Sequence, residues 1–202
     1  MAFVLRAFSN GMDGVFIGGC HLGECHYVTE GNVHALGMVL LCRKLMKLIG
    51  LDPARLRIEW VSAGEGIRFA EIMNDFAGRL KALGPLGRSE GLDEKALKLR
   101  LEAITAIVPY IRLVERERLR VRFDSEEKYE AFFNSDEVDR LLRELIAEKF
   151  NLSQIMLLMR ERPRPAGEIA GMLGLSRSEV ARYLHDSTRQ GLLTGRNGYT
   201  PA

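Results

Sequence analysis

The feature that most constrains the fold is a pair of short apolar runs separated by one long stretch of helical periodicity. The runs are residues 14–19 (GVFIGG) and residues 56–61 (LRIEWV), and glycines bound the first of them. Between them, residues 33–49 carry apolar side chains at helical spacing and end at Gly50. A strand, a helix and a second strand in this order predict two parallel strands joined by a right-handed crossover.

Two parallel strands alone form a thin sheet. Either further strands come from a partner, or residues 1–85 are the end of a larger α/β domain. Ser62, with Glu65 three residues later, predicts the N-terminal cap of a second helix that runs to about Leu83. The next dipeptide, Gly84-Pro85, stops a helix and marks the clearest linker in the chain. We therefore predict a first domain, residues 1–85, with a partial, flavodoxin-like parallel sheet.

Residues 86–150 are strongly charged and predict a mostly helical connecting segment. One helix is expected to begin at about Asp93 and to bend or end near Pro109, because proline disrupts a helix interior. Two further helices are expected near residues 125–133 and 136–149.

A strand is expected just before these two helices. In residues 116–123 (RERLRVRF), arginines alternate with Leu119, Val121 and Phe123. This alternation is typical of a strand with one solvated face.

The last segment, residues 151–202, has the order of a winged helix-turn-helix. Val180 and Leu184 are expected to face inward, and Ser176 to cap the third helix after a tight turn at Gly174. The predicted elements are helices over 152–160, 166–173 and 178–190, followed by a strand, a turn and a strand over 191–200.

Composition excludes several classes of protein. The chain has 202 residues, of which 47% are hydrophobic, so it is long and apolar enough to bury a core without disulfides. It has no run of about 18 apolar residues and no secretory signal at its start, so we expect a cytoplasmic protein without a membrane partner. The net charge of +2 is too small to indicate nucleic-acid binding by itself.

Three cysteines in such a chain favour thiols or metal ligands over disulfides. Cys42 lies at helical spacing with Met38, Leu45 and Ile49, so we interpret it as a thiol of the core.

The most informative stretch is residues 18–27 (GGCHLGECHY), which begins where the first strand ends. In parallel α/β sheets, ligands bind beyond the carboxyl ends of strands. Cys20 and Cys25 are four residues apart, so their thiolates can reach one iron or two adjacent irons. Spacing alone leaves the alternatives open: a metal or cluster site, two ordinary buried thiols, or a redox disulfide.

The residues around the two thiols have predicted supporting roles. Neighbouring residues on an extended chain point in opposite directions, so His21 rarely binds the same ion as Cys20. His21 and His26 are therefore expected to donate hydrogen bonds around a cluster. Gly19 and Gly23 would let the backbone approach an inorganic group and point amides at its sulfurs.

These residues resemble a known family, the iron-sulfur (delta) subunit of methyl-viologen-reducing hydrogenase, which is associated with heterodisulfide reductase complexes. The resemblance covers residues 1 to about 85, and residues 86–202 are similar to the C-terminal part of longer bacterial members, including residues 108–116 (VPYIRLVER) and the winged-helix end. It is carried by residues 14–27, residues 56–66 and residues 69–71.

The resemblance implies an electron-transfer subunit with a [2Fe-2S] cluster, in which Cys20 and Cys25 match the family motif. Such subunits relay electrons from a hydrogenase or a formate dehydrogenase to the flavin subunit of heterodisulfide reductase or a related complex. The family's other cluster cysteines lie in an upstream stretch, so we expect an incomplete ligand set in this chain. Three explanations remain open: a truncated chain, which we favour, a separate polypeptide that supplies the rest, or a lost cluster.

A redox- or metal-responsive winged-helix regulator is the alternative function. Three arginines of the last predicted helix could reach phosphates or base edges: Arg177, Arg182 and Arg189. Residues 151–202 carry no run of lysine and arginine, and DNA binding through phosphates favours more positive charge. We therefore expect the winged helix to dock protein, with nucleic acid as the less favoured partner.

Overall fold

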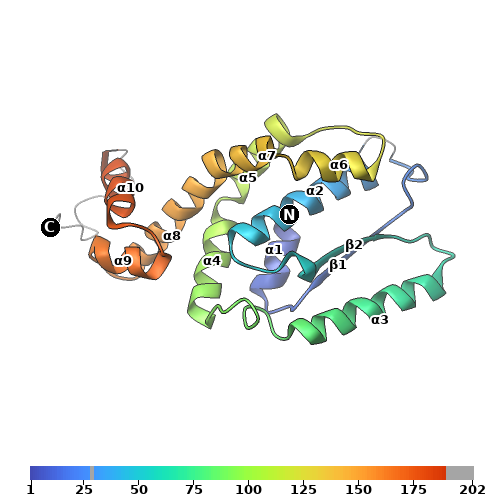
Figure 1. Cartoon of the computed structure of the whole chain (residues 1–202), viewed down its shortest axis with the longest axis horizontal. Helices are drawn as coiled ribbons and strands as arrows, with labels where there is room; N and C mark the ends of the chain where they lie inside the picture. Colours follow the sequence, from blue (N-terminus) through green and yellow to red (C-terminus); the bar gives the residue numbers. More distant parts are fainter. Residues whose placement is uncertain (28–29, 190–202) are drawn as a thin grey trace.

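The structure, a computed structural model, describes residues 1–27 and 30–189 of the 202-residue chain. Its first part contains a helix, two strands and two long helices (Figure 1). These are α1 (Ala2–Ser9), β1 (Val15–Gly19), α2 (Asn32–Leu48), a 3-10 turn (Pro53–Arg55), β2 (Leu56–Trp60) and α3 (Gly66–Leu83).

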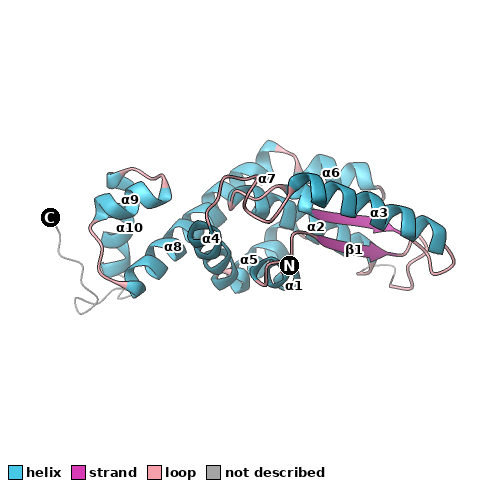
Figure 2. Ribbon diagram, turned by 90° about the horizontal axis from the view of Figure 1, so that it is seen from below, coloured by secondary structure: helices cyan, strands magenta, loops and turns pink. Residues whose placement is uncertain are grey.

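The rest of the described chain is helical (Figure 2). The α-helices are α4 (Glu94–Ala106), α5 (Val108–Val114), α6 (Glu126–Phe133), α7 (Asp136–Leu141), α8 (Glu148–Glu161), α9 (Ala166–Leu173) and α10 (Arg177–Arg189). Two π-helical segments, Glu115–Leu119 and Leu142–Ala147, follow α5 and α7 directly.

The two strands pair in parallel, which confirms the predicted strand–helix–strand unit. Val15 lies opposite Leu56 and Gly19 opposite Trp60, so the strands are aligned along their whole length. Helices α2 and α3 lie on opposite sides of this small sheet (Figure 1). The fold is thus mostly helical with a two-stranded parallel sheet near its start.

Helix α3 is attached to the sheet through few side chains. Only Ile72 and Phe76 of its 18 residues are buried. Phe16 of β1 contacts the rings of Phe69 and Phe76, with centroids 6.0 and 6.2 Å apart. Its start differs from the prediction, because residues 62–65 form a turn and the helix begins at Gly66. The Glu65 carboxylate still accepts a hydrogen bond from the Ser62 N–H (2.6 Å), as in one half of a capping box.

One hydrophobic core spans the first two predicted segments. It extends from Val4 to Phe150 and includes the fully buried side chains of Leu41, Ile104 and Ile146. A second cluster lies between α8, α9 and α10. Helix α8 contributes to both, since Phe150 belongs to the first cluster while Ile155, Leu158 and Met159 belong to the second.

The strand predicted over residues 116–123 is wrong. Its first half continues α5 as a π-helical segment, and within the described residues the sheet contains only β1 and β2. The alternation of burial is nevertheless real: Leu119 is buried and Val121 and Phe123 pack against the core. The arginines that alternate with them, Arg118, Arg120 and Arg122, are exposed. An extended segment with one buried face forms a strand only where a neighbouring strand offers hydrogen bonds, and here the Val121 carbonyl accepts from the Tyr129 hydroxyl instead (3.3 Å).

The break predicted near residue 150 does not occur. Helical backbone continues from Asp136 to Glu161, through α7, the second π-helical segment and α8. The sequence over this range has no glycine or proline, and the next breaker is Pro163.

The helix-turn-helix at the end of the described chain is confirmed. Gly174 is left-handed (φ +67°), and the Ser176 hydroxyl accepts the Glu179 N–H (3.2 Å) as a helix cap. Val180 and Leu184 are fully buried, as predicted. The predicted wing, residues 191–200, lies outside the described residues. No helix among the described residues is long and apolar enough to cross a bilayer.

Candidate metal centre beyond the parallel strands

The candidate site is the loop that leaves the carboxyl end of β1. Cys20 follows Gly19, the last residue of this strand, and the loop ends where α2 begins. The chain after β2 leaves from the same edge, because the two strands are parallel, and the Val61 N–H bonds the Gly19 carbonyl (2.8 Å). Both connections therefore meet at the sheet edge where α/β proteins bind ligands.

The three cysteines fall into two classes. Cys20 is exposed and Cys25 is half-buried, so both thiols of the loop are accessible. Cys42 faces the core from α2, with 2% of its surface exposed, and burial raises the pKa of its thiol. This confirms the interpretation of Cys42 as a core thiol and leaves Cys20 and Cys25 as the accessible pair.

A buried asparagine fixes the first cysteine in place. Asn32 is the first residue of α2 and is 6% exposed. Its side-chain amide donates to the carbonyl oxygens of Cys20 (3.0 Å) and His21 (2.8 Å). This residue was not among the predicted ones, although asparagine at a helix start is a recognisable signal of a side chain that bonds to local backbone.

Two contacts connect the loop to the turn after β2. The Nε2 atom of His21 lies 2.6 Å from the Glu65 carboxylate, and the Ser62 hydroxyl donates to Glu24 (3.3 Å). The pKa of Glu65 is lowered by the backbone N–H of Ser62 and by His21. The structure thus gives His21 a partner within the protein, and its predicted role beside a cluster stays a prediction.

The other predicted supporting residues have local structural roles. The exposed His26 packs edge-on against Tyr27, with ring centroids 5.2 Å apart. A side chain at Gly19 would lie 2.9 Å from the Trp60 ring, and Gly23 is left-handed (φ +90°). The approach of Gly19 and Gly23 to an inorganic group stays a prediction.

Gly31, also absent from the predicted residues, makes room for the second thiol. A Cβ atom at this position would lie 2.1 Å from the Cys25 Sγ. Any larger residue at position 31 would therefore displace the Cys25 sulfur. The sequence alone gives no sign of this requirement for glycine.

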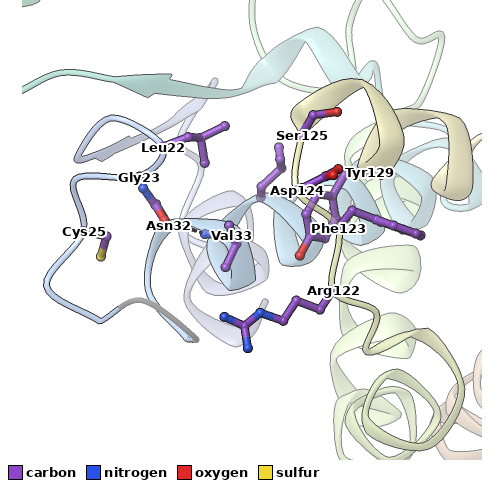
Figure 3. Close-up of a pocket in the computed structure, with 11 residues that line it drawn as sticks. Leu22, Gly23, Cys25, Asn32, Val33, Arg122, Phe123, Asp124, Ser125 and Tyr129 are labelled. Carbon is purple, nitrogen blue, oxygen red and sulfur yellow. Dashed lines mark hydrogen bonds between the residues drawn. The ribbon is translucent and has the colours of Figure 1, made fainter.

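A cavity of about 510 Å³ lies beside Cys25 (Figure 3). The loop and the start of α2 form one side, and residues 122–125 with Tyr129 form the other. Figure 3 shows Cys25 at the loop side of this cavity and Arg122 extending from the opposite side.

The donor set fits an iron-sulfur cluster in kind but not in number. Thiolates are the usual ligands of such clusters, which take four. Cys20 and Cys25 supply two, and the described residues contain no group of three or more histidine, cysteine or acidic side chains placed to hold a metal. The chain therefore provides at most half of the thiolate set from its described residues.

The arginines proposed for DNA binding lie on α10. All three are exposed, but Arg182 pairs with Glu148 (3.5 Å) and Arg177 packs over Gly167. Arg189 is at the last turn of the helix.

The fold and the cysteine loop define a class of protein, in which an α/β segment presents two accessible thiols at the carboxyl edge of parallel strands. Residues 1–84 match the family model "Methyl-viologen-reducing hydrogenase, delta subunit", so this segment is similar to the members of that family. This confirms the family resemblance seen in the sequence.

Individual relatives agree with this assignment. The iron-sulfur subunit of the F420-non-reducing hydrogenase of Archaeoglobus profundus is 49% identical over 83 residues, which are 41% of this chain and 60% of the relative. The iron-sulfur subunit of the F420-non-reducing hydrogenase vhc of Methanococcus voltae is 44% identical over 84 residues, 42% of this chain and 58% of the relative. The chain thus spans about three-fifths of the length of these subunits. Its residues after 84 lie outside the match to the family model.

A larger protein is also similar to part of this chain. It is one of the subunits of the ferredoxin/F(420)H(2)-dependent CoB-CoM heterodisulfide reductase of Methanosarcina acetivorans, and it is 46% identical over 85 residues, which are 42% of this chain and 11% of the relative. The relatives of this chain therefore include both hydrogenase subunits and a heterodisulfide reductase subunit.

Proposed function

We propose that this chain is an electron-transfer subunit in which Cys20 and Cys25 supply two thiolates to a [2Fe-2S] cluster. The observation that carries the proposal is the accessible thiol pair, held in one loop of the segment that matches the hydrogenase delta-subunit family model. The remaining thiolates would come from outside the described residues. When bound, the cluster supplies one-electron transfer, and the chain itself contributes ligands and their surroundings.

The chain's own residues position the two ligands. Asn32 fixes the backbone at Cys20, the His21–Glu65 contact fixes the side of the loop near β2, and Gly31 admits the Cys25 sulfur. Ligands that are held in place by neighbouring contacts before the metal binds are what a preorganised site requires.

The proposed partners follow from the names of the relatives. These are subunits of F420-non-reducing hydrogenase and of heterodisulfide reductase. We propose that the chain relays electrons from a hydrogenase or a formate dehydrogenase to a heterodisulfide reductase-type flavin subunit. A cytoplasmic location of this assembly stays a prediction.

Serine variants of the cysteines test the proposed ligands. In the assembly isolated without oxygen, Cys20→Ser and Cys25→Ser should each lose the visible absorbance of the cluster, because serine replaces a thiolate ligand. Cys42→Ser is the matched control and should keep the absorbance, since its thiol lies in the core. An unchanged spectrum in both loop variants would contradict the assignment.

We propose that the helix-turn-helix docks protein. The pairing of Arg182 with Glu148 and the packing of Arg177 favour this over DNA binding, because these contacts engage two of the three candidate arginines. Co-purification of the full chain with a flavin subunit, lost on deletion of residues 166–202, is the expected result. Salt-sensitive and sequence-selective binding of labelled DNA would instead support the regulator.

A further inference from the structure

The cavity beside Cys25 joins the family segment to the part of the chain outside it. One wall comes from Leu22, Gly23, Cys25 and the first turns of α2, all within residues 1–84. The other wall comes from residues 122–125 and Tyr129. The extension therefore completes the surroundings of one of the two accessible thiols.

The charged groups that line this cavity leave one free cation among the described residues. Arg122 and Asp124 are the charged side chains in the lining. Lys128 pairs with Asp124 (2.7 Å) and lowers the pKa of this carboxyl group, so the negative charge is locally offset. Arg122 has no ion pair in the described part of the chain, and Figure 3 shows its side chain directed toward the loop that carries Cys25.

We propose that Arg122 makes this cavity an approach to the Cys25 thiol that favours anions. A guanidinium stays charged at all physiological pH values, so its field acts on every ligand that enters. If the proposed function holds, the anion in this cavity is the iron-sulfur cluster itself, because a cluster held by thiolates carries net negative charge. That charge is one determinant of the reduction potential of the cluster. Arg122 is a positioning residue for this group, because it acts through its field and binds no iron.

The test uses two thiol reagents of different charge on the full chain without iron. A Cys20→Ser background leaves Cys25 as the accessible thiol, because Cys42 is buried. The rates of reaction with a dianionic aromatic disulfide, dithiobis(nitrobenzoate), and with a neutral one, dithiodipyridine, are measured at low salt. Arg122→Gln should lower the ratio of the anionic to the neutral rate several-fold, and added salt should reduce this difference because it screens exposed charges.

Two further variants make the result decisive. Arg118→Gln removes an exposed arginine of the same region that does not line the cavity, and it should keep the wild-type ratio. Arg122→Lys keeps the charge and should keep most of the ratio, which guards against a folding defect in Arg122→Gln. An unchanged ratio in Arg122→Gln, or an equal fall in Arg118→Gln, would overturn the proposal.

A second measurement applies to the iron-loaded assembly. There, Arg122→Gln should shift the midpoint potential of the cluster to more negative values, because the reduced and more negative state loses a stabilising cation. An assembly without iron would contradict the proposed function, yet the reagent ratio would still report on Arg122. The two claims can therefore fail separately.

Discussion

A single buried cation, Arg55, fastens the predicted linker to the first segment. Its side chain is fully buried, and it donates to the carbonyl oxygens of Asp13, Gly84 and Pro85 and to the carboxylate of Glu90 (2.6 Å). Hydrophobic patterning cannot reveal such a residue, because arginine is normally exposed. The Gly84-Pro85 dipeptide does end a helix as predicted, but the chain after it is held against the fold.

Removing this cation should destabilise the protein strongly. Arg55→Met leaves Glu90 buried without its partner, and breaking a buried pair in this way costs about 3–5 kcal/mol. Urea unfolding measures the loss, and Arg88→Met, a change at an exposed arginine, is the control. A loss of under about 1 kcal/mol, the range of exposed ion pairs, would show that the pair is not buried in solution.

The same pair predicts how stability depends on pH. Burial alone would raise the pKa of Glu90, but hydrogen bonds from Arg55 outweigh it and lower the pKa to about 2, from an ordinary value of 4.5. A folded-state pKa below the unfolded value means that the stabilisation is complete above pH 4.5 and is lost as the pH falls toward about 2. Glu90→Gln should therefore flatten the acid branch of the stability curve, and a wild-type slope in this variant would contradict the assignment.

Asn32 should control the order of the cysteine loop. Asn32→Ala removes both bonds to the carbonyls of Cys20 and His21, and losing a buried hydrogen-bond partner costs about 1–3 kcal/mol. Faster hydrogen exchange in residues 20–25 is the expected result, while Asn10→Ala, at the exposed end of α1, should leave that exchange unchanged. Equal rates of hydrogen exchange in residues 20–25 of the two variants would mean that Asn32 does not hold the loop.

At the scale of elements, the sequence predicts a helix or strand correctly where the local sequence signals agree with the packing of the folded chain. The strand pair, α2 with its end before Gly50, and α9 follow from periodicity and breakers, and the structure confirms them. Residues 116–123 show the limit, because alternation reports one buried face but does not create a neighbouring strand. The unbroken helix after Asp136 shows another, since an apolar stretch without breakers does not reveal where one core ends and the next begins.

The candidate site was predictable to a similar extent. The loop with Cys20 and Cys25 follows from glycines, thiols and a preceding strand within one short stretch. The contact of Gly31 with Cys25 and the role proposed for Arg122 could not be found in this way, because both depend on neighbours that only the folded chain brings together.

The capping box at the start of α10 should stabilise the first turn of this helix. Ser176 and Glu179 exchange hydrogen bonds, with the Ser176 N–H donating to the Glu179 carboxylate (2.8 Å). Ser176→Ala should cost about 1 kcal/mol and increase hydrogen exchange in the first turn of α10. His185→Ala, a change at an exposed residue of the same helix that lies away from the cap, should have a smaller effect. Equal effects of the two changes would argue against the cap.

At the scale of the whole molecule, the thiol loop and the helix-turn-helix lie at opposite ends (Figure 1). The helices between them connect two hydrophobic clusters, with α8 contributing to both. This separation lets a docking partner at α9 and α10 bind without covering Cys20 and Cys25.

The most direct test of the central claim is an iron and sulfide assay of the native assembly, isolated without oxygen, beside an assembly in which this chain carries both Cys20→Ser and Cys25→Ser. The account predicts that the double variant contains two fewer irons and two fewer sulfides per copy of this chain, the content of one [2Fe-2S] cluster. Equal iron and sulfide in the two assemblies would show that these thiols hold no cluster.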